Sequence, residues 1–326
     1  MKSEILRLLK ESDDYISGQQ MCDRFHVSRT AVWKAIEQLK KEGYEIEAVR
    51  NRGYRLLESP DIMSEAEIRS LMDTEWAGKN IVYFDEIDST NNRAKELGEK
   101  DGVHGTLFVA DRQVAGKGRR GRVWESPKGI SIYMTILLRP DLIPTKAPML
   151  TLVMAQSVAE GIREVTGMET GIKWPNDIVM NKKKVCGILT EMSTEIDYIN
   201  YVVIGVGINV NQKVFDEELK EKATSLMIET GAPVKRSALI AAVMKHFEIN
   251  HALFMENGDL SGLQESYNEM LVNRGKEVRI LEPGNEYNAH AYGINETGEL
   301  IVRTQKGEEK HIFAGEVSVR GIYGYV

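Results

Sequence analysis

The residues best suited to chemistry form a loop that combines glycine with positive charge. Three glycines lie between Gly116 and Gly121, and four of the six residues from Lys117 to Arg122 are cationic. Glycine lets backbone N–H groups approach a ligand, and arginine holds carboxylate or phosphate oxygens in a bidentate fork. Trp124 adds a flat face for a base or an apolar ring. This pattern indicates a site for an anionic ligand.

The glycine spacing also matches the dinucleotide-binding motif G-x-G-x-x-G, but that interpretation is rejected. The motif requires a strand immediately before it and a helix immediately after it. Residues 111–115 separate the preceding strand from the glycines, and Glu-Ser-Pro-Lys-Gly at 125–129 cannot open a helix. A disordered basic loop and a nucleic-acid patch remain alternatives for the loop taken alone.

Four further motifs are each weak evidence of function when taken alone, because each also has a purely structural interpretation. Asp-Ser-Thr-Asn at 88–91 follows a strand and opens a helix, or is only an N-cap cluster. Lys-Trp-Pro-Asn-Asp at 173–177 joins a strand end to a turn, or is only a turn. Lys184 begins a strand, or is one solvent-facing charge among three lysines. Gly-Val-Gly-Ile-Asn at 205–209 ends a buried strand on a polar side chain, or reflects close packing.

The elements that must position these motifs are predicted from periodicity. The expected strands are 81–84, 106–110, 131–138, 171–174, 185–191 and 201–209. The expected helices are 65–72, 91–99, 149–166 and 237–254. Because strands and helices do not alternate strictly, the fold class is expected to be α+β with a mixed sheet.

The N-terminal residues predict a winged helix-turn-helix. An amphipathic stretch opens the chain, a second helix runs from Ser17 to Phe25, and a third begins after Ser28 and stops at Gly43. Two short alternating strands then meet at a basic tip. In this geometry the third helix enters the DNA major groove, and the wing contacts phosphates. The expected DNA-binding residues are Ser28, Arg29, Thr30, Lys34, Arg50 and Arg52, with Arg55 further along the wing. A helical scaffold or a protein-docking module is the alternative.

Closely spaced short strands predict a small β-barrel at the C-terminal end. The strands are expected at 277–281, 287–294, 300–304, 310–313 and 317–319, with turns at 283–284, 297–298 and 306–307. The expected domains are residues 1–63, 64–270 and 271–326.

Composition limits the class of protein. The two cysteines, Cys22 and Cys186, exclude a disulfide framework and favour a reducing cytoplasm. Residues 1–57 carry a net charge of +2 and the remainder −9, which allows an anionic partner at the front end. The charged first fourteen residues exclude a signal-peptide core, and no apolar stretch approaches the roughly 20 residues of a membrane span.

In this order the five motifs resemble the biotin protein ligase family, and the resemblance covers the whole chain. It is strongest to the bifunctional members, which are both biotin ligase and biotin-operon repressor. The resemblance implies a winged helix-turn-helix, a mixed-sheet catalytic domain of the biotin/lipoate ligase type and an SH3-like C-terminal barrel. One departure is Lys117, where the family usually has arginine; a lysine lacks the planar fork.

The resemblance implies an ATP-dependent, AMP-forming ligase with Mg²⁺. Biotin and ATP would form biotinyl-5′-AMP, and biotin would pass to a lysine of a biotin carboxyl carrier protein domain. Lys184 and Arg119 would be catalytic. Biotin would be bound by Ser89, Thr90, Asn91, Gln113, Gly116, Lys117, Arg119, Arg120, Lys184 and Gly187. The nucleotide would be bound by Arg122, Trp124, Asn176, Asp177 and Asn209.

The adenylate is further expected to drive homodimerisation and binding to operator DNA. Two other functions stay open: a ligand-sensing transcription factor without turnover, and a lipoate-type ligase. No covalent enzyme intermediate is needed, so Cys186 is expected to be a core residue. The histidines show no zinc spacing, and no direct metal cluster of protein ligands is expected.

Overall fold

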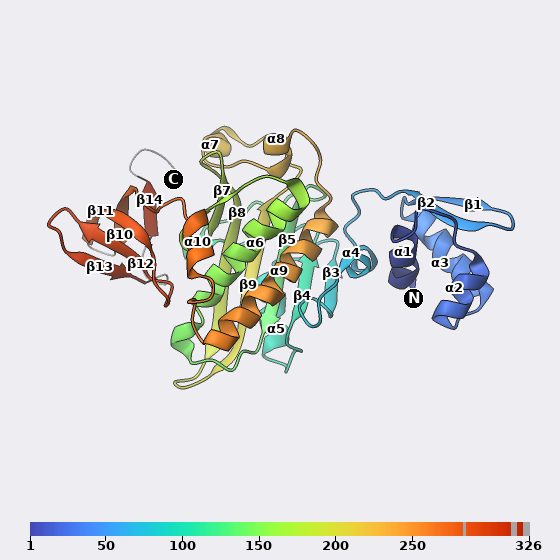
Figure 1. Ribbon diagram of the computed structural model, residues 1–326, viewed down its shortest axis with the longest axis horizontal. Coiled ribbons are helices and arrows are strands. Elements are labelled where there is room, and N and C mark those ends of the chain that lie inside the picture. The colour runs from blue at the N-terminus through green and yellow to red at the C-terminus, as the bar shows by residue number, and fades with distance from the viewer. Residues whose placement is uncertain (283–284, 314–317, 322–326) are drawn as a thin grey trace. The chain divides into compact units, whose positions relative to one another are not determined.

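The computed structural model describes residues 1–282, 285–313 and 318–321 (Figure 1). The chain divides into two compact units, Met1–Asp73 with Lys235–Ala241, and Thr74–Val234 with Ala242–Val326. The predicted turn at Pro283-Gly284 and Val317, the first residue of the predicted last strand, lie outside the described residues.

The first unit has the predicted winged-helix elements. They are α1 (Lys2–Lys10), α2 (Gly18–Phe25), α3 (Arg29–Lys41), β1 (Glu45–Val49), β2 (Gly53–Glu58) and α4 (Glu65–Leu71). Ser17 forms a capping box on α2, and Ser28 accepts a hydrogen bond from Ala31 N at the start of α3. The strands β1 and β2 pair antiparallel as the wing. Leu6, Ile36 and other apolar residues on the inner helix faces are fully buried.

Polar contacts attach α4 to the winged helix. The Arg7 guanidinium donates to the carbonyls of Arg69, Ser70 and Met72 at the C-terminal end of α4. A positive charge at this position stabilises a helix, because the last carbonyls of a helix have no partner within it. The Lys10 ammonium pairs with the buried Glu67 carboxylate. The first compact unit therefore extends past the predicted boundary at residue 63.

The centre of the second unit is a mixed sheet. Within the described residues it has seven strands in the order β3-β4-β5-β9-β8-β7-β6. They are β3 (Ile81–Phe84), β4 (Thr106–Ala110), β5 (Ser131–Leu138), β6 (Gly171–Lys173), β7 (Asp177–Met180), β8 (Lys183–Thr194) and β9 (Ile199–Asn209). Only β3 and β4 are paired in parallel among these neighbours. The mixed-sheet prediction is confirmed, and β7 is an additional short strand between two turns.

Helices cover both faces of this sheet (Figure 1). The helices of this unit include α5 (Thr90–Gly98), α6 (Met149–Thr166), α7 (Glu217–Lys220), α8 (Leu226–Thr230), α10 (Gln264–Met270) and most of α9 (Arg236–Asn257). On one face α6 crosses the strands, with the Thr151 hydroxyl 2.7 Å from that of Thr190. On the other face Ala94 of α5 packs against Phe108 and Val203. Since neighbouring strand residues point to opposite faces, Leu189 points to the face covered by α5.

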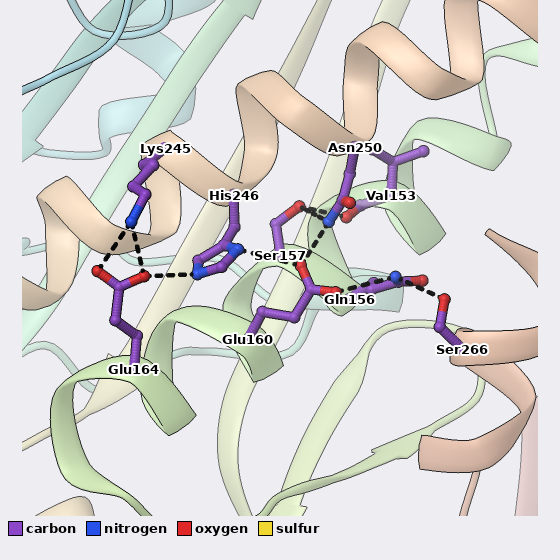
Figure 2. Close-up of polar contacts among 9 residues, drawn as sticks. All are labelled: Val153, Gln156, Ser157, Glu160, Glu164, Lys245, His246, Asn250 and Ser266. Carbon is purple, nitrogen blue, oxygen red and sulfur yellow. Dashed lines mark hydrogen bonds and ion pairs between the residues drawn. The ribbon is translucent and has the colours of Figure 1, made fainter. Parts of the chain in front are cut away.

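A polar cluster joins α6 to α9 (Figure 2). His246 places Nε2 2.8 Å from the Glu164 carboxylate and Nδ1 3.4 Å from that of Glu160. Asn250 donates to Glu160 at 2.7 Å and to Ser157 at 3.0 Å. The hydrogen bond with Glu160 raises the pKa of His246 above its ordinary value, against the opposing effect of burial. The two helices are thus held together by a set of hydrogen bonds that includes a titratable group.

The C-terminal strands form an antiparallel sheet. In the described ranges the strand order is β13-β12-β11-β10-β14. The two edge strands, β13 and β14, are not paired with each other in these ranges, so the described strands do not close into the expected barrel. The strands are β10 (Glu277–Glu282), β11 (Asn285–Ile294), β12 (Leu300–Thr304), β13 (Glu309–Ile312) and β14 (Ser318–Gly321). The buried Trp174 indole attaches this sheet to the central mixed sheet by donating to Gly298 O at 3.1 Å.

Among the described helices, none has the length and apolar character that crossing a membrane requires.

Candidate functional site

A pocket forms on the α5 face of the central sheet, where the glycine-arginine loop lies against β8 and β9. It brings together residues from all five predicted motifs. The predicted site residues that line it are Ser89, Thr90, Asn91, Gln113, Lys117, Arg119, Trp124, Asn176, Lys184 and Gly187. Segments more than a hundred residues apart in sequence, such as Ser89 and Gly207, therefore meet at one cavity.

One end of the pocket is a wall of neutral hydrogen-bonding groups. Thr90 N donates to Gln113 Oε1 at 2.8 Å, and the Thr90 hydroxyl donates to the same oxygen at 3.1 Å. Ser89 is the N-cap residue of α5 but makes no capping bond with its side chain. This favours a ligand-binding role for these residues over the alternative that they only cap a helix. The wall suits a ligand with amide-like N–H and C=O groups.

The other end carries cations. Lys184 Nζ lies 2.6 Å from the Asp177 carboxylate, whereas Lys183 turns away and donates to Lys220 O at 2.9 Å. Arg119 donates to Asn176 Oδ1 at 2.9 Å, and burial lowers the pKa of its guanidinium. A lysine of the sheet and an arginine of the loop that line the same pocket can stabilise two anions that must react with each other.

Glycines form the floor on which the loop rests. An added Cβ at Gly207 would lie 2.6 Å from the Trp124 ring, and one at Gly187 would lie 2.9 Å from both that ring and Lys184. Trp124 Nε1 is buried and has no hydrogen-bond partner among the described residues. The cavity measures about 50 Å³, below the roughly 300 Å³ of small ligand sites. The loop residues Lys117, Gly118, Arg119 and Trp124 are part of the lining of this narrow cavity.

The remaining predicted residues do not line the cavity. Asp177 supports Lys184 from beside the pocket. The buried Asn209 side chain donates to Thr224 O at 3.1 Å. Gly116 accepts from Trp124 N at its carbonyl and closes the base of the loop. Arg120 and Arg122 are exposed on the loop.

Two further predictions concern Lys117 and Cys186. The exposed Lys117 lines the pocket edge and donates to Asn92 Oδ1 at 3.0 Å, so here its charge reaches the start of α5. Burial raises the pKa of the Cys186 thiol, which fits the expected core residue. Both cysteines are free and buried.

Sequence reasoning missed part of the cavity wall. Met134, Leu189 and Val206 add apolar surface between the polar wall and the cations. Gly205, Val206 and Gly207 also line it; they belong to the motif already identified at 205–209, although none of them was named as a site residue.

Groups that suit a nucleotide and a magnesium ion lie together here. The Asp177 carboxylate and the Asn176 amide are at the cationic end, and the orphaned Trp124 Nε1 is nearby. Magnesium is usually held by one or two carboxylates together with substrate phosphates. The described residues contain no group of three or more His, Cys, Asp or Glu side chains that could hold a metal ion.

The first unit presents a second candidate surface on α3 and the wing. Thr30, Lys34 and Arg50 are exposed, as contact with DNA would require. The Ser28 side chain is used as a cap, and the exposed Arg29 side chain donates to Gln19 Oε1 at 2.8 Å. The outward face of α3 also carries Trp33, which is 54% exposed and which the sequence analysis did not single out.

The wing arginines are less free than their sequence suggests. Arg55 lies opposite Glu47 in the β1–β2 register and pairs with it at 3.0 Å. Arg52 lies over the Tyr15 ring and 3.5 Å from Asp14. The strand register thus places an acid beside Arg55 that residues 50–55 themselves lack, and a DNA contact by Arg55 stays a prediction.

Comparisons with known proteins agree with this arrangement. Residues 83–209 match the Biotin/lipoate A/B protein ligase family, residues 2–55 an HTH domain and residues 275–320 the Biotin protein ligase C terminal domain. The bifunctional ligase/repressor BirA of Bacillus subtilis is 42% identical over 98% of both chains, and that of Escherichia coli is 28% identical over 96% of this chain and 95% of its own. The biotin protein ligase of Aquifex aeolicus, solved with biotin and ATP, superposes with a TM-score of 0.66 at 34% identity, covering 74% of this chain and 99% of its own.

Proposed function

The chain belongs to the biotin/lipoate A/B protein ligase family, and from this premise we propose that it is both a biotin protein ligase and a biotin-responsive transcriptional repressor. The observation that carries the enzymatic part is the pocket, in which a neutral hydrogen-bonding wall and a cationic end face each other. Its substrates are biotin and ATP, and its acceptor is a lysine of a biotin carboxyl carrier protein domain.

The first step joins two anions. A biotin carboxylate oxygen attacks the α-phosphorus of ATP, the bond to the β-phosphate oxygen breaks, and pyrophosphate leaves. Lys184 and Arg119 offset the charge that builds up between the carboxylate and the α-phosphate. In the second step the carrier lysine amine attacks the acyl carbon and AMP leaves. Neither step needs a covalent bond to the enzyme.

The neutral wall binds the ureido ring of biotin. Ser89, Thr90, Asn91 and Gln113 offer donors and acceptors to its N–H and C=O groups, and Met134 and Leu189 contact its apolar part. Lys117, Arg120 and the backbone at Gly116 and Gly187 support the carboxylate end.

The nucleotide lies toward the opposite side of the loop. Trp124 contacts the adenine, Arg122 and Asn176 the phosphates, and Asn209 supports this end from beneath. Asp177 would hold Mg²⁺ together with the phosphates, and the ion would neutralise the departing pyrophosphate. Closure of residues 116–124 over the adenylate excludes water, which protects the mixed anhydride from hydrolysis.

The repressor part depends on the first unit. The α3 face with Thr30, Trp33 and Lys34 enters the major groove, and Arg50 and Arg52 of the wing contact phosphates. With a net charge of only +2 in residues 1–57, one copy should bind DNA weakly. We propose that the adenylate orders the loop of residues 116–124 and so favours a homodimer. The homodimer then binds an inverted-repeat operator with both winged helices, and the protein acts in the cytoplasm.

One assay separates the main alternatives. Purified protein is incubated with ATP and either biotin or lipoate, and the acyl-adenylate is sought by mass spectrometry. Biotinyl-5′-AMP is expected; lipoyl-AMP would favour a lipoate ligase, and binding without turnover would favour a ligand sensor.

A second assay addresses repression. Operator DNA is titrated with and without biotin plus ATP, in parallel with sedimentation. Equal DNA affinity under both conditions would refute the proposed switch. A chain lacking residues 1–73, cut after α4, should retain adenylation and lose DNA binding, because α4 depends on Arg7 and Lys10 for its packing.

A further inference from the structure

The neutral wall of the pocket rests on one buried hydroxyl outside it. Thr135 lies in β5 with none of its surface exposed. Its Oγ1 lies 2.6 Å from Asn91 Oδ1 and 2.8 Å from Thr90 Oγ1, and its single proton is shared between these two acceptors. Both acceptors belong to the first turn of α5 and line the cavity. One side chain in the sheet therefore orients two side chains of the site.

The hydrogen bonds continue from Thr135 in both directions. Asn91 Nδ2 donates to the Glu191 carboxylate at 2.8 Å. Thr90 Oγ1 donates to Gln113 Oε1 at 3.1 Å, and Gln113 Nε2 lies 3.1 Å from Ser126 Oγ. With its single proton directed to Gln113, the Thr90 oxygen retains a lone pair for an N–H donor in the cavity.

The strand next to β5 leaves the space that this arrangement needs. Thr135 is paired directly with Gly205 of β9, so the two residues lie side by side on the sheet. A Cβ at Gly205 would lie 2.1 Å from Asn91 Oδ1. Any larger residue there would displace the amide that Thr135 holds.

We propose that Thr135 is a positioning residue for biotin, which holds Thr90 as a hydrogen-bond acceptor for a ureido N–H and fixes Asn91 beside it. This inference rests on the proposed function, because it assigns the polar wall to the ureido ring. It predicts that Thr135 acts on biotin binding and not on the chemistry at the cationic end.

The alternative is that Thr135 only stabilises the sheet, and Thr106 provides a matched control. Thr106 is a buried threonine of the neighbouring strand β4, and its hydroxyl donates to Val103 O at 2.7 Å, away from the pocket. Thr135→Val and Thr106→Val remove the same group from the same sheet.

The experiment measures steady-state pyrophosphate release for the full chain as biotin and ATP are varied separately. Thr135→Val should raise the KM for biotin about tenfold to a hundredfold, the usual effect of leaving a buried polar partner unsatisfied. Its kcat and its KM for ATP should stay near wild type. Thr135→Ser should restore the KM for biotin, and Gly205→Ala should raise it through the displaced Asn91.

The outcomes separate the inference from the proposed function. If wild-type protein forms no biotinyl-5′-AMP, the proposed function fails. If wild type is active and Thr135→Val leaves the KM for biotin unchanged, or Thr106→Val raises it equally, Thr135 has only a structural role. If Thr135→Val unfolds, Thr135→Ala is measured in its place, and a wild-type KM for biotin in folded Thr135→Ala would overturn the inference.

Discussion

The two adjacent lysines at the start of β8 allow a stringent test of the catalytic assignment. Lys184 faces the pocket, where its Nζ lies 2.6 Å from Asp177 and 5.2 Å from the centre of the Trp124 ring. Lys183 precedes it, and its ammonium donates instead to Lys220 O. Replacing either lysine by alanine removes one positive charge from the same strand, but only Lys184→Ala removes it from the cavity.

The magnitude follows from what Lys184 would do in the transition state. Negative charge builds up between the carboxylate and the α-phosphate, and no other lysine of β8 lines the pocket among the described residues. Removing one preorganised group that stabilises developing charge typically costs about 2.7–4 kcal/mol, or on the order of 10²–10³ in rate. The half-buried pair with Asp177 is also lost, so a modest fall in thermal midpoint is expected without unfolding.

The assay is pyrophosphate release at saturating biotin and ATP, with circular dichroism to check the fold. Lys184→Ala should lose rate by the stated factor, and Lys183→Ala should keep wild-type rate. Near wild-type release by Lys184→Ala would refute the assignment. Equal losses in the two variants would show that the general charge of this strand matters and that the cavity does not.

Three further outcomes are expected. Arg119→Ala should weaken retention of biotinyl-5′-AMP more than it lowers the thermal midpoint, measured by ligand dissociation and melting, since a partly exposed loop side chain has little packing to lose. A sharp fall in midpoint with intact affinity would make the loop structural. Trp33→Ala should weaken operator binding without changing its salt dependence, because no charge is lost; unchanged affinity would remove it from the DNA interface. His246→Gln should have a lower thermal midpoint than wild type at pH values below about 6.5. This difference should vanish as the pH rises through the raised pKa of folded His246. A difference in thermal midpoint that is constant with pH would contradict the contacts in Figure 2.

Much of the fold was predictable because its signals are local. Ser17 and Ser28 cap their helices as the sequence indicated, and the apolar runs of β4 and β5 have the predicted bounds. The short elements β7 and α10 were not foreseen, since a few residues between turns carry little periodicity. β7 is paired with β6 and β8 in the sheet, and α10 contacts β6 and β11.

The chemical character of the site was also present in the sequence. A glycine-rich cationic loop, a lysine at a strand start and an Asn-Asp pair predict binding of anions wherever they meet, because charge and hydrogen-bonding capacity belong to the side chains themselves. The five motifs in order also identified the family that the comparisons show.

Only the tertiary structure decided which of these groups share a cavity and which are already paired. The strand register turns Lys184 to the pocket and Lys183 away, sets Glu47 beside Arg55, and places Thr135 next to Gly205. These relations depend on pairing between strands distant in sequence, and a shift of one residue would reverse every face. Composition and periodicity within a segment carry no record of that register, so Thr135 could not be recognised until β5 and β9 were paired.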